Sequence, residues 1–307
     1  MENHTAKHFV LQLGSLVSLY LSVSFLLVLL FGIINIMFPD AAEGYWAIES
    51  ASSSIRLGIA MVVVFFPTYL ILTRIVNTSR RAANAGTYLG LTKWLIYLSL
   101  LIGGVVLLGD LVAVIMGFLE GELTVRFFLK ALAVLVVVGA AFYYYLLDAK
   151  GYWMKEEQKS MIFAGLMGVV VGASVIFGFM NIETPAEVRE GRLDAQQLTD
   201  LQNIQYQVES YLALNNAVPE KLGDLEMGES LPVAAEEREP YTYEKTDNGF
   251  KLCATFAKAS DPNEMGWAPV FDETAAIKNR DNWTHSEGRY CFERVVNPSG
   301  TQLPVKN

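Results

Sequence analysis

Apolar residues gather in five long segments before residue 181, and short polar segments separate them. A helix needs about 20 apolar residues to cross the ~30 Å hydrocarbon core of a bilayer. Each segment reaches that length, so the pattern predicts a five-helix transmembrane bundle over residues 14–180, after a tail of residues 1–13. The expected spans are 14–38, 56–75, 91–119, 125–147 and 161–180.

The pattern changes after residue 180. Residues 181–192 read as a polar linker, and apolar residues then recur at helical spacing from Leu198 to Leu212. Segments 241–245 and 250–256 resemble strands around a hairpin turn at Asp247-Asn248-Gly249, and 289–296 predicts a third strand. We therefore expect residues 193–307 to form a small α+β domain, with one helix on an antiparallel sheet.

The distribution of basic residues predicts the orientation of the spans. Cytoplasmic loops carry an excess of Lys and Arg, and segments 39–55 and 120–124 contain neither. The first span is too long for a cleaved signal peptide, so it is expected to remain as the first of the five. Because the loops after the first and third spans lack Lys and Arg, we expect these loops outside and the N-terminus in the cytoplasm. Five spans then place the C-terminal domain on the other side of the membrane. The basic residues that set this orientation are Arg74, Arg80, Arg81, Lys93, Lys150, Lys155 and Lys159.

The net acidity of the chain belongs to its C-terminal domain. Residues 1–180 contain 11 Lys and Arg against 10 Asp and Glu, whereas residues 181–307 contain 12 against 22. Nucleic acid is therefore not expected as a partner, because phosphate binding needs a basic face. The expected partners are the lipid bilayer and a protein of the cell envelope.

Both cysteines of the chain, Cys253 and Cys291, lie on predicted strands of this domain. Outside the cytoplasm two such cysteines usually form a disulfide; the alternative is a pair of buried free thiols. The chain has no Cys/His metal spacing, phosphate loop or nucleophile–base set, so we expect no enzymatic activity and no cofactor.

Charged residues near the outer ends of the spans form a candidate site. Glu122, Arg126 and Lys130 recur every four residues, which places them on one helix face. Asp110 lies within the third span, where a carboxylate needs a partner, and Arg56 opens the second. This outer cluster either locks the helix register or binds a headgroup, ion or small solute.

Small residues follow one face of the fifth span at four-residue spacing: Ala164, Gly168 and Gly172. Such a stripe permits close approach of a second helix. It predicts either packing within the bundle or a homo-oligomer.

Several segments of the membrane part resemble an uncharacterised bacterial family, a domain of unknown function, over about residues 8–150. The resemblance implies the helical architecture and the outer charged residues, and no activity. The segments are Ile34-Asn35, Phe38-Pro39-Asp40, Phe66-Pro67-Thr68-Tyr69-Leu70, Lys93-Trp94-Leu95, Gly109-Asp110-Leu111 and Gly121-Glu122-Leu123-Thr124.

The C-terminal domain resembles type IV pilin-like proteins, particularly the major pseudopilin of type II secretion, over about residues 192–296. The resemblance implies a pilin-like fold, and calcium bound near Asp261, Asn263, Glu264 and Asp272 or, alternatively, solvated loop acids there. The fifth span lacks a pilin leader and its glutamate, so we expect a fixed display module. The matching segments are Asp200-Leu201-Gln202-Asn203-Ile204, Leu252-Cys253-Ala254-Thr255-Phe256 and Gly288-Arg289-Tyr290-Cys291-Phe292.

These expectations together predict a multi-pass protein of a bacterial inner membrane. Its extracytoplasmic domain would dock a partner in the envelope, such as a pilus or secretion component or the cell wall. The alternative is transport, sensing or binding of a small ligand or ion at the outer cluster.

Overall fold

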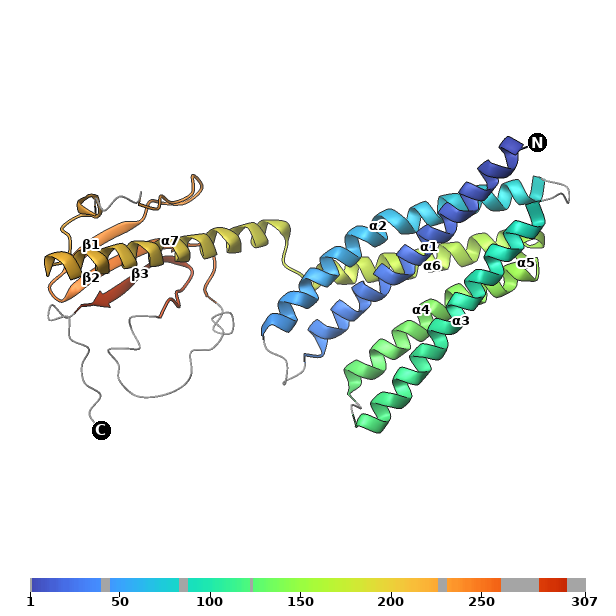
Figure 1. The fold of residues 1–307 in the computed structure, drawn as a ribbon, viewed down its shortest axis with the longest axis horizontal. Helices are drawn as coiled ribbons and strands as arrows, with labels where there is room; N and C mark the ends of the chain where they lie inside the picture. Colours follow the sequence, from blue (N-terminus) through green and yellow to red (C-terminus); the bar gives the residue numbers. More distant parts are fainter. Residues whose placement is uncertain are drawn as a thin grey trace. The chain divides into compact units, whose positions relative to one another are not determined.

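The computed structural model describes residues 2–39, 45–82, 88–121, 124–225, 231–260 and 282–296. The chain divides into two compact units, Met1–Ile182 and Glu183–Asn307 (Figure 1). The first unit is entirely helical where it is described, and the second combines a long helix with a sheet. The boundary therefore falls immediately after the last apolar helix.

Five helices of the first unit are long and apolar enough to cross a membrane, which confirms the predicted count of apolar helices. They extend past the predicted spans because flanking polar residues continue the same helices; Arg80 and Arg81, for example, lie inside α2. Many of their large apolar side chains are exposed, including Leu101, Leu108 and Leu119 of α3 and Val169 of α6. The helices are α1 Glu2–Met37, α2 Tyr45–Ala82, α3 Tyr88–Glu120, α4 Val125–Ala149, the short α5 Tyr152–Lys155, and α6 Glu157–Met180.

Helices α1 and α2 pack closely because glycines lie at their contact. A Cβ atom on Gly58 would lie 2.8–2.9 Å from Leu29, and one on Gly32 would lie 2.7 Å from Ile55. Leu29 and Ile55 are fully buried there. A glycine at each position lets the backbones approach, so these two residues set the closest contact of the pair.

In the second unit, helix α7 (Pro185–Asn215) begins earlier than the sequence suggested. The predicted linker 181–192 was too long: residues 185–192 are helical, because Thr184 and Glu187 form a reciprocal capping box and Pro185 opens the helix. Hydrogen bonding to Thr184, first to its backbone N–H, holds the pKa of Glu187 below its ordinary value.

The sheet of the second unit has three antiparallel strands in the order β1–β2–β3, which confirms the predicted strands. The strands are β1 Thr242–Thr246, β2 Gly249–Phe256 and β3 Gly288–Val295, and a short 3₁₀ helix, η1, covers Leu222–Asp224. Alternate β2 residues (Phe250, Leu252, Ala254 and Phe256) are buried in a core with Leu201, Ile204 and Val208 of α7. One face of the sheet therefore packs on the helix, as alternation along a strand requires.

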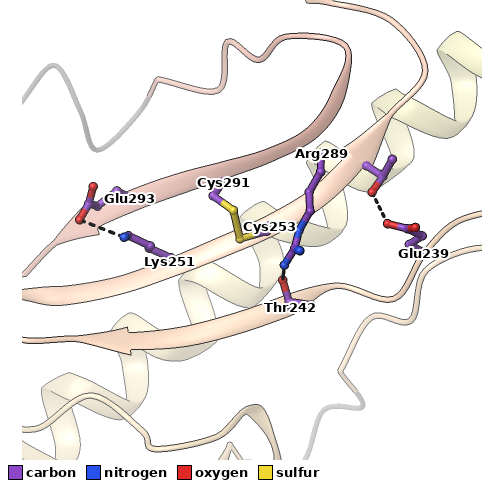
Figure 2. The surroundings of a disulfide bond; sticks show 8 residues. Glu239, Thr242, Lys251, Cys253, Arg289, Cys291 and Glu293 are labelled. Atoms are coloured by element: carbon purple, nitrogen blue, oxygen red, sulfur yellow. Dashed lines mark hydrogen bonds and ion pairs between the residues drawn. A yellow bond between two sulfur atoms is a disulfide. The ribbon is translucent and has the colours of Figure 1, made fainter.

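A disulfide joins Cys253 of β2 to Cys291 of β3, so the predicted pairing is confirmed. The two residues are direct partners in the strand register. Their side chains lie on the face of the sheet opposite α7, beside the Lys251–Glu293 ion pair and the Arg289–Thr242 hydrogen bond (Figure 2). The bond therefore fastens the last strand from outside the core.

Candidate functional site

The residues of the outer cluster lie on three helices: Arg56 on α2, Asp110 on α3, and Arg126 and Lys130 on α4. Glu122 lies outside the described residues. The Lys130 Nζ is 5.9 Å from the centre of the Phe31 ring. In the described part of the chain, Asp110 has no ion-pair partner. The cluster and the ligand or ion binding assigned to it remain predictions.

The stripe of small residues lies on α6 beside open space. A Cβ atom on Gly168 or Gly172 would meet no atom within 4 Å. For Ala164 and Gly168, this open space is a cavity that these two residues line, which is described below. Among the described glycines, close helix contacts are made by Gly32, Gly58, Gly117 and Gly178, and not by Gly168 or Gly172. The role of the stripe in helix packing or in an oligomer remains a prediction.

A buried polar network lies where α2 and α4 end and α6 begins, which we call the basic end of the bundle. The Arg80 Nη1 donates hydrogen bonds to both Asp148 carboxylate oxygens, at 3.0 and 3.1 Å. The Asp148 side chain is only 5% exposed. Arg80 also reaches the Asn77 Oδ1 at 3.4 Å, and the Asn77 amide lies 3.4 Å from the Tyr144 hydroxyl. The network therefore ties the last turns of α2 and α4 together.

The short helix α5 closes this end with an aromatic cluster. Gly151, at φ 69°, allows the chain to turn from α4 into α5. The Trp153 ring then stacks on Tyr144 at a centroid distance of 5.1 Å, and its indole N–H donates to the Tyr144 carbonyl at 2.9 Å. Arg81 donates to the Trp153 carbonyl and pairs with Glu157 at 2.7 Å. Helices α2, α4, α5 and α6 are thereby connected at one place.

A cavity of about 400 Å³ opens next to this network, between α2 and α6 with Tyr144 of α4. This volume lies in the range of small-molecule sites. Its apolar lining is Phe66, Leu70, Met161, Phe163, Ala164, Gly165, Met167 and Gly168, and its polar lining is Tyr69, Thr73, Arg74, Asn77, Arg81, Tyr144, Glu157 and Ser160.

The cavity has a polar and an apolar end. Along α2 the lining changes from Phe66 and Leu70 to Arg74, Asn77 and Arg81, and along α6 it changes in the opposite sense. The helices run in opposite directions here, so the charged residues of both meet at the basic end. Such a cavity suits an amphipathic ligand whose charged group lies at that end.

The sequence contains a pattern that indicates this cavity and the polar network beside it. Tyr69, Thr73, Asn77 and Arg80 recur at spacings of three and four, which places them on one helix face. The predicted second span ends at residue 75, but α2 continues to Ala82 and carries Arg80 and Arg81 on the same helix. The partner Asp148 is 68 residues away, and only the fold brings it to Arg80.

Metal binding finds no further support in the structure. Among the residues that are described, no group of three or more His, Cys, Asp or Glu side chains could hold a metal ion. The residues of the expected calcium loop, 261–272, lie outside that set.

Comparison with known proteins supports the membrane part alone. Residues 8–145 match the family model described as a domain of unknown function (DUF5671), in agreement with the first resemblance. No curated protein and no solved structure matches the chain. The pilin-like resemblance of the second unit therefore stays a prediction.

Proposed function

We propose that this chain is an integral membrane protein that holds the unit Glu183–Asn307 outside the cytoplasm as a docking domain. The observation that carries the proposal is the disulfide between Cys253 and Cys291. Disulfides persist in oxidising compartments and are rare in the cytosol. A disulfide-bonded domain that directly follows five apolar helices fits a domain displayed on the outer side of a membrane.

The charges of the first unit support the same orientation. Arg80 and Arg81 near the end of α2, and Lys155 and Lys159 around the start of α6, lie at the basic end. The last apolar helix starts at this end and leads away from it to the second unit. Positive residues favour the cytoplasmic side, so the second unit falls on the extracytoplasmic side.

The role we propose for the displayed unit is contact with a partner in a bacterial envelope, either a pilus or secretion component or the cell wall. The sheet face opposite α7 offers a surface for it. That face carries charged side chains of both signs, including Lys251, Arg289 and Glu293, around the disulfide (Figure 2). The proposal includes no catalytic step.

Affinity purification from gently cross-linked native membranes tests the docking role. The full chain should enrich at least one envelope protein that a variant lacking residues 183–307 does not. A double charge reversal on the exposed sheet face, Lys251→Glu with Arg289→Glu, should reduce that enrichment several-fold. The control is Arg192→Glu, a charge reversal at an exposed residue of α7, which packs on the other face of the sheet. Identical sets of bound proteins with and without residues 183–307 would contradict the docking role.

A further inference from the structure

We propose that the cavity between α2 and α6 binds one anionic phospholipid, with its phosphate at the basic end and one acyl chain along the apolar lining. The site is separate from the displayed unit, because all the residues that line it belong to the first unit. The inference therefore rests on the proposed membrane insertion and orientation of the first unit, and not on the docking role.

The dimensions of the cavity fit one leaflet of a bilayer. A helix rises about 1.5 Å per residue, so Phe66 and Arg74 are about 12 Å apart along α2. One leaflet contributes about 15 Å of hydrocarbon. A phosphate beside Arg74 would thus place an acyl chain alongside Leu70 and Phe66, facing Ala164 and Gly168 of α6.

Small residues on α6 leave the space for this chain. Ala164, Gly165 and Gly168 line the cavity, and a Cβ on Gly165 or Gly168 would meet no atom within 4 Å. Larger side chains there would occupy the groove. The cavity therefore has unfilled space beside Ala164, Gly165 and Gly168, where the acyl chain would lie.

Charge at the polar end favours an anion. Arg74 and Arg81 line the cavity together with one acid, Glu157, and that acid is paired with Arg81. In the described part of the chain, the Arg74 side chain has neither an ion-pair nor a hydrogen-bond partner. Its guanidinium is thus available for a phosphate, which it can bind through two parallel hydrogen bonds. Basic pockets between membrane helices on the cytoplasmic side are known to bind anionic headgroups.

Native mass spectrometry of the full chain, released from detergent after delipidation, tests the proposal directly. Added phosphatidylglycerol should give one retained lipid per chain, and phosphatidylcholine should be retained at least fivefold less. Arg74→Gln should lower retention of phosphatidylglycerol about fivefold, since one cation near a headgroup contributes about 1 kcal/mol. Glycerol phosphate, a headgroup without chains, should not compete.

Two matched controls separate this site from the general lipid shell. Gly168→Leu should abolish retention by filling the cavity, whereas Gly172→Leu, one turn further along α6 and outside the lining, should leave it unchanged. Lys93→Gln, an exposed cation on α3 outside the lining, should also have no effect.

Several results would overturn the proposal. They are equal retention of both lipids, equal retention by all the variants, or a dimer that Gly168→Leu converts to monomer, which would make a second copy the occupant. A photoactivatable phosphatidylglycerol on the unmodified chain keeps the test valid if a variant fails to fold. Its cross-links should map to Met161, Phe163 or Met167, and cross-links confined to α3 would contradict the site.

Discussion

Replacing Asp148 with asparagine should lower the free energy of unfolding of the helical unit by about 3 kcal/mol. Asp148 is the buried partner of Arg80, and removal of one member of a buried ion pair typically costs 3–5 kcal/mol because a charge remains unpaired. We expect the lower end of that range, since the Arg80 side chain is 20% exposed and water can reach part of it. Unfolding in mixed micelles with increasing denaturing detergent measures the change.

The neighbouring ion pair at the same end is the matched control. Glu157 pairs with Arg81 at 2.7 Å, but its side chain is 52% exposed. Glu157→Gln should therefore change stability by less than about 1 kcal/mol. The double variant Arg80→Met with Asp148→Leu should recover most of the loss, because apolar replacements of a buried pair are often neutral. Equal losses from Asp148→Asn and Glu157→Gln would show that burial of the pair is unimportant.

Removing the disulfide should destabilise the second unit by about 4 kcal/mol. Cys253 and Cys291 are 38 residues apart, and closing a loop of that length removes about this much free energy from the unfolded chain in the entropy model. A change of this size corresponds to roughly a thousandfold shift in the unfolding equilibrium. Hydrogen exchange of the full-length Cys253→Ser, Cys291→Ser variant measures it, as faster exchange in α7 and the three strands.

The same sample contains its own control. Peptides from Met1–Ile182 should exchange at unchanged rates, because the disulfide lies entirely in the other unit. Reduction of the unmodified protein should reproduce the exchange of the double variant. Unaltered protection of α7 after loss of both sulfurs would mean that the core of Leu201, Ile204 and Phe250 holds the unit without the bond.

Local sequence patterns predicted the features that depend on neighbours in the chain. The length of an apolar run can be read directly from the sequence, so the five apolar helices were predictable. Alternation from Phe250 to Phe256 likewise gave the buried face of β2 and put Cys253 on the opposite face. The start of α7 at Pro185 was not predicted, because the capping box of Thr184 and Glu187 was not taken into account.

Features that depend on distant residues were not predictable in the same way. The contact of Gly58 with Leu29 depends on where two helices cross, and a glycine in an apolar run does not reveal its neighbour. The cavity exists because Ala164 and Gly168 lie opposite Phe66 and Leu70 and have no bulky side chains to fill the space. The spacing of Ala164, Gly168 and Gly172 predicted a stripe of small residues, but it did not predict which helix lies opposite them.

The central claim is that Glu183–Asn307 lies outside the cytoplasm with its disulfide formed, and thiol trapping in intact cells tests it most directly. A membrane-permeant alkylating reagent is applied first, and the denatured protein is then reduced and tagged with a mass-shifting maleimide. We expect both cysteines to escape the first reagent and to accept the tag after reduction. In spheroplasts, a membrane-impermeant reductant followed by an impermeant maleimide should label the exposed Cys291. Alkylation of both cysteines in intact cells without reduction would contradict a disulfide-bonded, extracytoplasmic unit.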